Sequence, residues 1–326
     1  MAQHTPDELL ALVNTAIEAL NLEQQPTRLY EPIRYTLSMG GKRIRPVMCL
    51  TSCELFGVQP EQALPAALSL ELFHNFTLLH DDIMDKAEKR RNRDCVHIKW
   101  NENVAILSGD AMQIMAFDCL KGLPDSALRE SLTLFNQTAL EVCEGQQFDM
   151  DFEQDTQVTE VDYLNMIRLK TGVLLAASLK LGAIAAGAKP ADADKLYEMG
   201  IHIGIAFQLQ DDLLDVYGDT ATFGKNIGGD ITTNKKTFLL IQALKRADPA
   251  TRAELLRWIS AESPNPEVKI AAVTAIYDKT RVKESCQEEM EHHYRKALDS
   301  LEAVSLPSAR KEPLLRIASQ LMKRNS

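Results

Sequence analysis

The sequence predicts an all-α protein that forms a single large helical bundle. Apolar residues recur at spacings of three and four along nearly all of the 326-residue chain, which is the period of an amphipathic helix. The two-residue alternation of half-buried strands is hard to find. No long Gly/Ser-rich or Pro-rich linker divides the chain. We therefore expect one domain over residues 1–326, built from roughly ten or more helices.

The expected helices follow one another with only local punctuation. Glycine pairs at Gly40-Gly41 and Gly228-Gly229, and isolated prolines such as Pro124 and Pro190, mark the turns. Between them, the clearest helical periodicity covers residues 7–20, 63–79, 103–117, 131–142, 195–214 and 238–247.

The composition excludes several classes of protein. Apolar residues make up 45% of the chain, which is ordinary for a soluble globular protein. The net charge of −10 argues against a nucleic-acid binder, which would usually be basic. The six cysteines include no CxxC pair, so buried thiols are favoured over a disulfide framework or a zinc site.

No segment has the pattern of a signal peptide or a membrane span. The first residues, MAQHTPDELLALV, lack a basic region followed by an apolar core. The most apolar stretch, residues 173–188, is interrupted by Lys180 and is too short to cross a bilayer comfortably. We expect a cytoplasmic protein without a transmembrane segment.

The first chemical signal is the stretch LLHDDIMDKAEKRR at residues 78–91. It places Asp81, Asp82 and Asp85 at the end of an apolar helix. Residues four apart share a helix face, so Asp81 and Asp85 lie together, with His74 on the same stripe two turns earlier. Alone, one such motif could equally be a solvated acidic turn.

A second copy of the motif favours a metal-binding role over a solvated acidic turn. Residues 207–218 read FQLQDDLLDVYG, in which Asp211, Asp212 and Asp215 repeat the spacing and Gln208 joins the stripe of Asp211 and Asp215. Acids so close together repel one another, and burial would raise their pKa values unless a cation compensates. Mg²⁺ prefers a few carboxylates plus waters and substrate phosphates. Two such clusters facing one cavity would hold a diphosphate through Mg²⁺.

Basic residues accompany both acidic motifs. Arginine forks and lysine charges are the groups that recognise phosphate. Taken singly, each of these residues is more often an ordinary surface cation, but they stand beside glycines and acid clusters. They are Lys42, Arg43 and Arg45 in GGKRIRP, Arg90 and Arg91 after the first motif, Lys170 in RLKTG, Lys225 in FGKNIGGD, and Lys235 and Lys236 in NKKT.

These motifs together resemble the trans-type isoprenyl diphosphate synthases, the polyprenyl synthetase family, over about residues 25–300. The segments that carry the resemblance are GGKRIRP, LLHDDIMDKAEKRRN, EGQQFD, LKTG, FQLQDDLLD and GKNIGGDITTNKKT, in this order. The resemblance implies an all-α isoprenoid synthase fold, a single large helical bundle around a central active-site cavity. It also implies a homodimer and a Mg²⁺-dependent enzyme with about three ions per active site. Such an enzyme joins an allylic diphosphate (dimethylallyl, geranyl or farnesyl) to isopentenyl diphosphate.

The resemblance also implies roles for individual residues. The implied Mg²⁺ ligands are Asp81, Asp82, Asp85, Asp149, Asp211, Asp212 and Asp215, with Asp212 and Asp215 in a supporting role. The implied residues for the allylic diphosphate are Arg90, Lys170 and Lys225, and those for isopentenyl diphosphate are Lys42, Arg45, His74 and Arg91. Gln146 would line the same cavity, and Lys235 would close that cavity late. The implied catalytic residues are Lys170, Thr171, Gln208, Asp81 and Asp211, with Thr171 and Gln208 facing the allylic cation.

One position departs from the family pattern. The family usually has glycine after the arginine pair, and this chain has Asn92. Asparagine tolerates a left-handed backbone, so we expect little effect.

Two other functions share part of this pattern. A class I terpene cyclase also uses DDxxD and Mg²⁺, but it has no need of GGKRIRP, and its second metal motif normally mixes Asn, Ser and Glu. A non-catalytic subunit of a heteromeric prenyl synthase usually has degraded aspartate motifs, whereas both are intact here.

Product length is expected to depend on the residues just before the first motif. Phe76 and Thr77 lie five and four residues before Asp81. A bulky side chain there would block the end of the tunnel that holds the growing prenyl chain. A helical wheel puts Thr77 more directly below Asp81, and Phe76 could simply be a core residue. By resemblance, we expect a fifteen- or twenty-carbon all-trans product.

Overall fold

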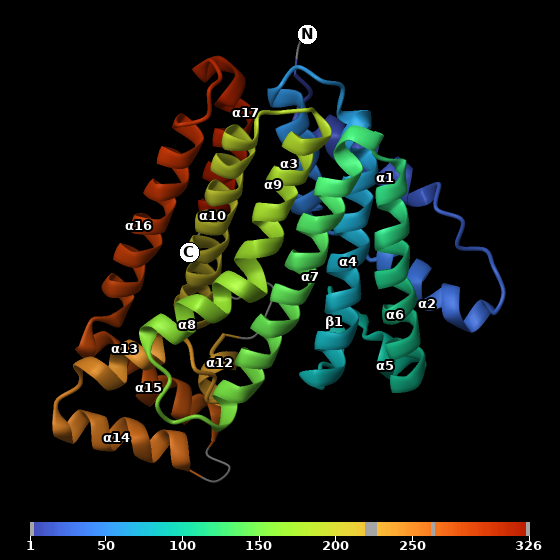
Figure 1. The fold of residues 1–326 in the computed structure, drawn as a ribbon. Coiled ribbons are helices and arrows are strands. Elements are labelled where there is room, and N and C mark those ends of the chain that lie inside the picture. Colours follow the sequence, from blue (N-terminus) through green and yellow to red (C-terminus); the bar gives the residue numbers. More distant parts are fainter. Residues whose placement is uncertain (1–2, 219–226, 262–264, 324–326) are drawn as a thin grey trace. The chain divides into compact units, whose positions relative to one another are not determined.

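The computed structural model describes residues 3–218, 227–261 and 265–323. These residues are almost entirely helical, and the only sheet among them is the two-stranded antiparallel hairpin β1-β2 (Figure 1). The all-α prediction is confirmed. None of the helices in these ranges is long and apolar enough to cross a membrane.

The N-terminal elements run through the first aspartate motif to α7. They are α1 (Pro6–Glu18), α2 (Thr27–Ser38), α3 (Ile44–Leu55), η1 (Pro60–Ala63), α4 (Leu64–Met84), β1 (Lys89–Arg90), β2 (Arg93–Asp94), α5 (Val96–Lys99), α6 (Glu102–Cys119), η2 (Leu120–Gly122) and α7 (Asp125–Gln154).

The remaining elements carry the second aspartate motif and the C-terminus. They are α8 (Glu160–Ile167), the π-helical turn η3 (Arg168–Gly172), α9 (Val173–Ala185), α10 (Pro190–Tyr217), α12 (Gly229–Thr232), α13 (Phe238–Arg246), α14 (Pro249–Ser260), α15 (Pro266–Thr280), α16 (Val282–Glu302) and α17 (Ser308–Met322).

The chain forms two compact units. The first unit comprises residues 1–136, 177–197 and 304–314, and the second comprises residues 137–176, 198–303 and 315–326. The first aspartate motif therefore belongs to the first unit and the second motif to the second unit.

The core of the first unit is built around α4. Its apolar residues Leu70, Leu72 and Phe73 are fully or almost fully buried. The ring of Phe73 meets that of Phe135 on α7 edge to face, with the centroids 5.4 Å apart, a favourable aromatic geometry. This packing fixes the helix whose last turn carries the first aspartates.

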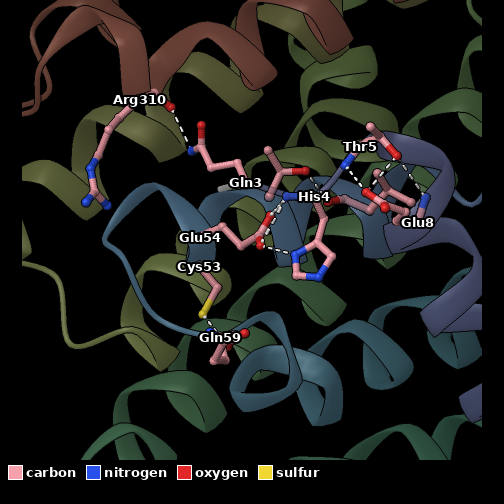
Figure 2. Close-up of polar contacts among 10 residues, drawn as sticks. Gln3, His4, Thr5, Glu8, Cys53, Glu54, Gln59 and Arg310 are labelled. Atoms are coloured by element: carbon pink, nitrogen blue, oxygen red, sulfur yellow. Dashed lines mark hydrogen bonds and ion pairs between the residues drawn. The ribbon is translucent and has the colours of Figure 1, made fainter. Parts of the chain in front are cut away.

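The N-terminal segment is anchored to the first unit by polar contacts (Figure 2). The imidazole and backbone amide of His4 both hydrogen-bond the carboxylate of Glu54, which is buried near the end of α3. The Gln3 amide donates to the carbonyl of Arg310 at 3.1 Å. A capping box between Thr5 and Glu8 then begins α1.

The core of the second unit joins α8, α10, α13, α15 and α16. Tyr163, Leu209, Phe238, Tyr277 and Cys286 belong to one continuous buried cluster. Tyr163 of α8 is 1% exposed. This cluster fixes α10, which carries the second aspartate motif.

Candidate active site

The first aspartate motif occupies the last turn of α4. The helix ends at Met84, and Asp85 is its C-cap residue. The Asp82 side chain is buried, and the Arg90 guanidinium of β1 grips it with Nε 2.8 and 3.0 Å from its two carboxylate oxygens. Burial acts to lower the pKa of Arg90, but the hydrogen bond and charge of Asp82 raise it overall. Asp82 therefore anchors the hairpin to α4.

The turn of the hairpin brings Arg91 onto the GGKRIRP segment. Arg91 and Asn92 both have left-handed backbone, with φ of 52° and 61°, as a tight two-residue hairpin turn requires. Asn92 thus adopts the conformation expected for it. A Cβ built on Gly41 would lie 2.6 Å from Nη2 of Arg91. The backbone of Gly41 has φ 133°, a conformation that residues with a Cβ rarely adopt, so glycine is favoured beneath this guanidinium.

Arg45 and His74 complete a cationic cluster in the first unit. Arg45 Nη1 lies 3.1 Å from His74 Nε2. Burial, followed by the charges of Arg45 and Arg91, holds the pKa of His74 well below its ordinary value. The imidazole is therefore neutral at physiological pH, and the excess positive charge suits a diphosphate. The structure brings together three residues predicted to bind isopentenyl diphosphate; Lys42 is exposed on the adjoining segment.

Arg43 differs from its neighbours in GGKRIRP. The sequence groups it with the phosphate-binding cations, but its side chain is buried and forms an ion pair with Glu71 of α4. Its other terminal nitrogen donates to the carbonyl of Leu37 at 2.6 Å. The backbone of Arg43 is left-handed, with φ 44°. Arg43 thus holds the turn that presents Lys42 and Arg45.

The second aspartate motif lies near the end of α10. Asp211 and Asp215 are partly buried, and Asp212 is buried. The Tyr163 hydroxyl donates to Oδ2 of Asp212, and Nε2 of Gln208 lies 3.4 Å from Oδ1. Burial, reinforced by the charge of Asp230, raises the pKa of Asp212 to about 7. The pKa of Asp212 is thus raised, as expected for a buried acid beside other acids.

Asp215 holds the segment that leads to Lys235. Its Oδ2 accepts a hydrogen bond from the Asp230 amide at 3.0 Å, and its carbonyl accepts one from the Gly228 amide at 2.6 Å. These contacts attach α12 to α10. Lys235 Nζ then lies 3.7 Å from Oδ2 of Asp149 on α7.

Asp149 joins two of the predicted lysines. Lys170 Nζ donates to its Oδ2 at 2.7 Å. Burial acts to raise the pKa of Asp149, but Lys235 and Lys170 outweigh it and lower the pKa. Lys170 lies on the π-helical turn η3, and such turns occur often at functional sites. The structure thus brings Asp149, Lys170 and Lys235 together within the second unit.

Close backbone contacts bring Thr171 to Gln208. A Cβ built on Gly204 of α10 would lie 2.5 Å from the Cα of Gly172, so only glycine allows this approach. One turn after Gly204, the Oε1 of Gln208 accepts a hydrogen bond from the Thr171 hydroxyl at 3.2 Å. The two residues predicted to face the allylic cation are therefore direct partners.

The structure describes the two predicted chain-length residues but not Lys225. Lys225 lies outside the described residues. Phe76 is 7% exposed and contacts Phe73 and His80, with ring centroids 5.4 and 4.8 Å apart. The Thr77 hydroxyl donates to the His74 carbonyl at 2.8 Å. The roles of Phe76 and Thr77 in product length remain predictions.

The carboxylates fit a cation that takes most of its coordination shell from water molecules and substrate oxygens. Within residues 3–218, 227–261 and 265–323, no three His, Cys, Asp or Glu side chains converge into a ready-made metal site. Each motif instead offers a few hard oxygen donors. Mg²⁺ commonly binds one or two carboxylates together with waters and phosphate oxygens.

Sequence reasoning missed the residues that hold these groups in place. Tyr163 contacts Asp212 and Glu71 contacts Arg43, but both lie within ordinary helical patterns. Asp230 lies in the motif GKNIGGDITTNKKT, which gives no sign that its backbone amide donates to Asp215. The approach of Gly172 to Gly204 was also missed. The weak available signal was a glycine one turn before Gln208.

The comparisons with known proteins agree with this geometry. The polyprenyl synthetase family model matches residues 26–276. A geranylgeranyl diphosphate synthase of Methanosarcina mazei is 42% identical over 236 residues, covering 72% of this chain and 73% of its own. A short chain isoprenyl diphosphate synthase of Methanothermobacter thermautotrophicus is 38% identical over 300 residues, covering 92% and 91%.

Solved structures show the same fold. A crystal structure of a geranylgeranyl pyrophosphate synthase superposes with a TM-score of 0.94 at 39% identity, covering 99% of this chain and 100% of that one. A Corynebacterium glutamicum geranylgeranyl pyrophosphate synthase, complexed with isoprenyl diphosphate and magnesium, has a TM-score of 0.84 at 30% identity and 98% coverage of both chains. With the family model matching most of its length and both aspartate motifs in place, this chain belongs to the polyprenyl synthetase family.

Proposed function

We propose that this protein is a prenyltransferase that condenses an allylic diphosphate with isopentenyl diphosphate, head to tail, to make a short-chain all-trans prenyl diphosphate. The observation that carries the proposal is the family match across residues 26–276 in a chain whose two aspartate motifs are both intact. Relatives named geranylgeranyl diphosphate synthase favour a twenty-carbon product within the fifteen- to twenty-carbon range.

The allylic diphosphate is assigned to the aspartate motifs and their lysines. Breaking its carbon–oxygen bond places negative charge on the departing diphosphate. Asp81 and Asp211 would hold Mg²⁺, about three ions by family resemblance, and the bound cations would offset that negative charge. Lys170 adds a cation, and Asp149, 2.7 Å from it, keeps that side chain in position.

Isopentenyl diphosphate is assigned to the cluster of Lys42, Arg45, His74 and Arg91. The neutral His74 imidazole can donate a hydrogen bond to a phosphate oxygen, and the arginines supply the charge. This side of the site needs no carboxylates. Binding there orients the double bond for attack on the allylic cation.

Thr171 and Gln208 are assigned to the face of the developing cation. The Thr171 hydroxyl donates to Gln208 Oε1, so its own oxygen lone pairs remain available to face positive charge. Oriented dipoles of this kind stabilise charge at little cost in reorganisation. The closing proton loss is left to the released diphosphate, as the family resemblance implies.

We further propose that residues 1–326 act as a single isoprenoid synthase domain and that the protein is a homodimer. The family match runs through both compact units, which supports one functional domain. Leu107 and Ile114, two turns apart on α6, are 60% and 69% exposed. Apolar side chains this exposed are typical of a face that another chain covers.

The test is a condensation assay with the purified chain alone, Mg²⁺, labelled isopentenyl diphosphate and each allylic starter. We expect a labelled prenyl diphosphate longer than the starter. A cyclic hydrocarbon released from the allylic substrate would instead identify a terpene cyclase. Product formation only after a second polypeptide is added would identify a subunit of a heteromeric synthase.

Single substitutions then test the two-motif assignment. Asp81→Ala and Asp211→Ala should each lower kcat by orders of magnitude, because each removes an oxygen ligand for Mg²⁺. Circular dichroism should show intact helices in both variants. Asp118→Ala is the matched control and should retain turnover, because the Asp118 side chain is exposed on α6. Near-normal turnover in either motif variant would contradict the assignment.

A further inference from the structure

We propose that Tyr163 is a positioning residue of this active site: acting through Asp212, it fixes the amide of Gln208 against Thr171. The inference rests on the proposed function and deepens it. It adds a residue that reaches no substrate itself and controls the group that faces the allylic cation.

The Tyr163 hydroxyl is held firmly. The side chain is 1% exposed and belongs to the buried cluster that includes Ile167, Leu209 and Phe238. Its only described hydrogen bond is donated to Oδ2 of Asp212, 49 residues away in sequence. A ring packed in this way has little freedom, so its hydroxyl is a fixed point for the carboxylate.

The two oxygens of Asp212 have different partners. Oδ2 accepts from the Tyr163 hydroxyl, and Oδ1 lies 3.4 Å from the amide nitrogen of Gln208. Because one oxygen is fixed, rotation of the carboxylate about its last torsion would break the contact to Tyr163. The other oxygen therefore stays directed at Gln208.

This contact determines which way the Gln208 amide faces. Its nitrogen can only donate and its oxygen can only accept. With Nε2 on Asp212, Oε1 is left to accept from the Thr171 hydroxyl at 3.2 Å. The flipped amide would place its oxygen against Oδ1 of Asp212, which is repulsive when Asp212 is ionised. The hydrogen bonds from Tyr163 through Asp212 therefore favour one orientation of the Gln208 amide, with Oε1 toward Thr171.

The first aspartate motif has a parallel arrangement. Its middle residue, Asp82, is also buried, and Arg90 holds both of its oxygens. In both motifs, the second aspartate is fixed by a side chain from another element. The parallel supports an anchoring role for Asp212.

The test uses Tyr163→Phe, which removes one oxygen and keeps the ring. We expect kcat to fall about tenfold, while KM for both substrates changes less than about twofold, because the lost contact serves the transition state. Tyr217→Phe is the matched control, since Tyr217 lies on α10, as Asp212 does, but its hydroxyl donates to Asp278 of α15 at 3.0 Å. It should leave kcat within about twofold of the wild type.

A double-mutant cycle separates positioning from simple stabilisation. If Tyr163 acts through Gln208, then Tyr163→Phe should have little further effect on kcat in a Gln208→Ala background. Additive losses, a normal kcat in Tyr163→Phe or a selective rise in KM would overturn the proposal. Should Tyr163→Phe fail to fold, Asp212→Asn replaces it in the same cycle, with the same expected lack of additivity.

A measurement without turnover keeps the proposal separate from the proposed function. In protein with labelled glutamine side chains, Tyr163→Phe should shift the Gln208 amide resonances, whereas Tyr217→Phe should not. An unmoved Gln208 signal would overturn the positioning role even in an active enzyme. If Tyr163→Phe moves the Gln208 signal but the wild-type protein shows no condensation, only the proposed reaction is contradicted.

Discussion

At the scale of single residues, the site is organised by how charges are paired. Around His74, the arginines outnumber nearby acids, and the imidazole is kept neutral. Arg43 is neutralised by Glu71, and Arg90 is held by Asp82. The other cations on this side are Arg45 and Arg91, which lie near His74, and the exposed Lys42. This distribution makes separate predictions for the two substrates.

Replacing Arg91 by Ala should raise KM for isopentenyl diphosphate about tenfold or more, and KM for the allylic substrate much less. The guanidinium lies against Gly41 within the cluster assigned to the homoallylic diphosphate. Arg93→Ala is the matched control, because Arg93 lies on the same hairpin but stacks over Tyr35. Steady-state kinetics with each substrate varied in turn would measure both effects. An equal or reversed effect would mean that the two diphosphate sites are exchanged.

Replacing Phe76 by Ala should lengthen the product by at least one five-carbon unit. The ring is buried against Phe73, His80 and Gly109 of α6, so its loss should open volume before the first motif. The cavity should cost about 3–5 kcal/mol of unfolding free energy. Chromatography of dephosphorylated products at matched substrate ratios measures the length. An unchanged distribution in an active variant would place the end of the tunnel elsewhere, with Thr77 the first residue to test.

At the scale of elements, short polar contacts decide how segments are attached. The hairpin that carries Arg90 and Arg91 is held at both ends. Asp82 grips Arg90, and the Tyr35 hydroxyl of α2 donates to the Asp94 carbonyl at 2.9 Å. The N-terminal segment is attached in the same manner, by His4 on Glu54 (Figure 2). That second attachment titrates.

The attachment of the N-terminal segment should weaken as pH rises. The hydrogen bond to Glu54 raises the pKa of His4 above its ordinary value of 6.5. A raised pKa in the folded state means that this stabilisation is fully present below about pH 6.5 and is lost as pH rises through the folded pKa. His4→Gln should therefore lower Tm near pH 6 and have less effect near pH 9. A Tm difference that is constant over this range would contradict the prediction.

At the scale of the whole molecule, α6 presents an apolar face that the described chain leaves exposed. Ile106, Leu107 and Ile114 are 41%, 60% and 69% exposed. Exposure of several large apolar side chains on one helix is unusual for a surface that faces only water. The proposed homodimer would cover them.

A double substitution, Leu107→Glu with Ile114→Glu, should convert the dimer to a monomer. Charges placed in an apolar interface would lose hydration without finding partners. Val268→Glu on α15 is the matched control, since that side chain is 53% exposed. Size-exclusion chromatography with light scattering measures the mass. A wild-type monomer, or a double variant that remains dimeric, would contradict the proposed interface.

The sequence by itself determined the helices and the chemical types of the site. Apolar residues at helical spacing predicted most of α1, α4, α6, α10 and α13, because local periodicity needs no knowledge of the partner. The same holds for the aspartate motifs, whose spacing alone places acids on one face. The residues 131–142 proved to be only the middle of the longer helix α7, since exposed polar turns at its ends weaken the periodic signal.

Only the tertiary structure decided which side chains serve as supports. Arg43 and Arg45 are two residues apart in one motif, yet the first is paired with Glu71 and the second reaches His74. Tyr163 lies 49 residues from Asp212 and carries no local signal of that contact. The close approach of the Gly172 and Gly204 backbones likewise joins segments that are far apart in sequence. Burial and long-range pairing depend on how helices pack, and that is a property of the folded chain and not of any short stretch of sequence.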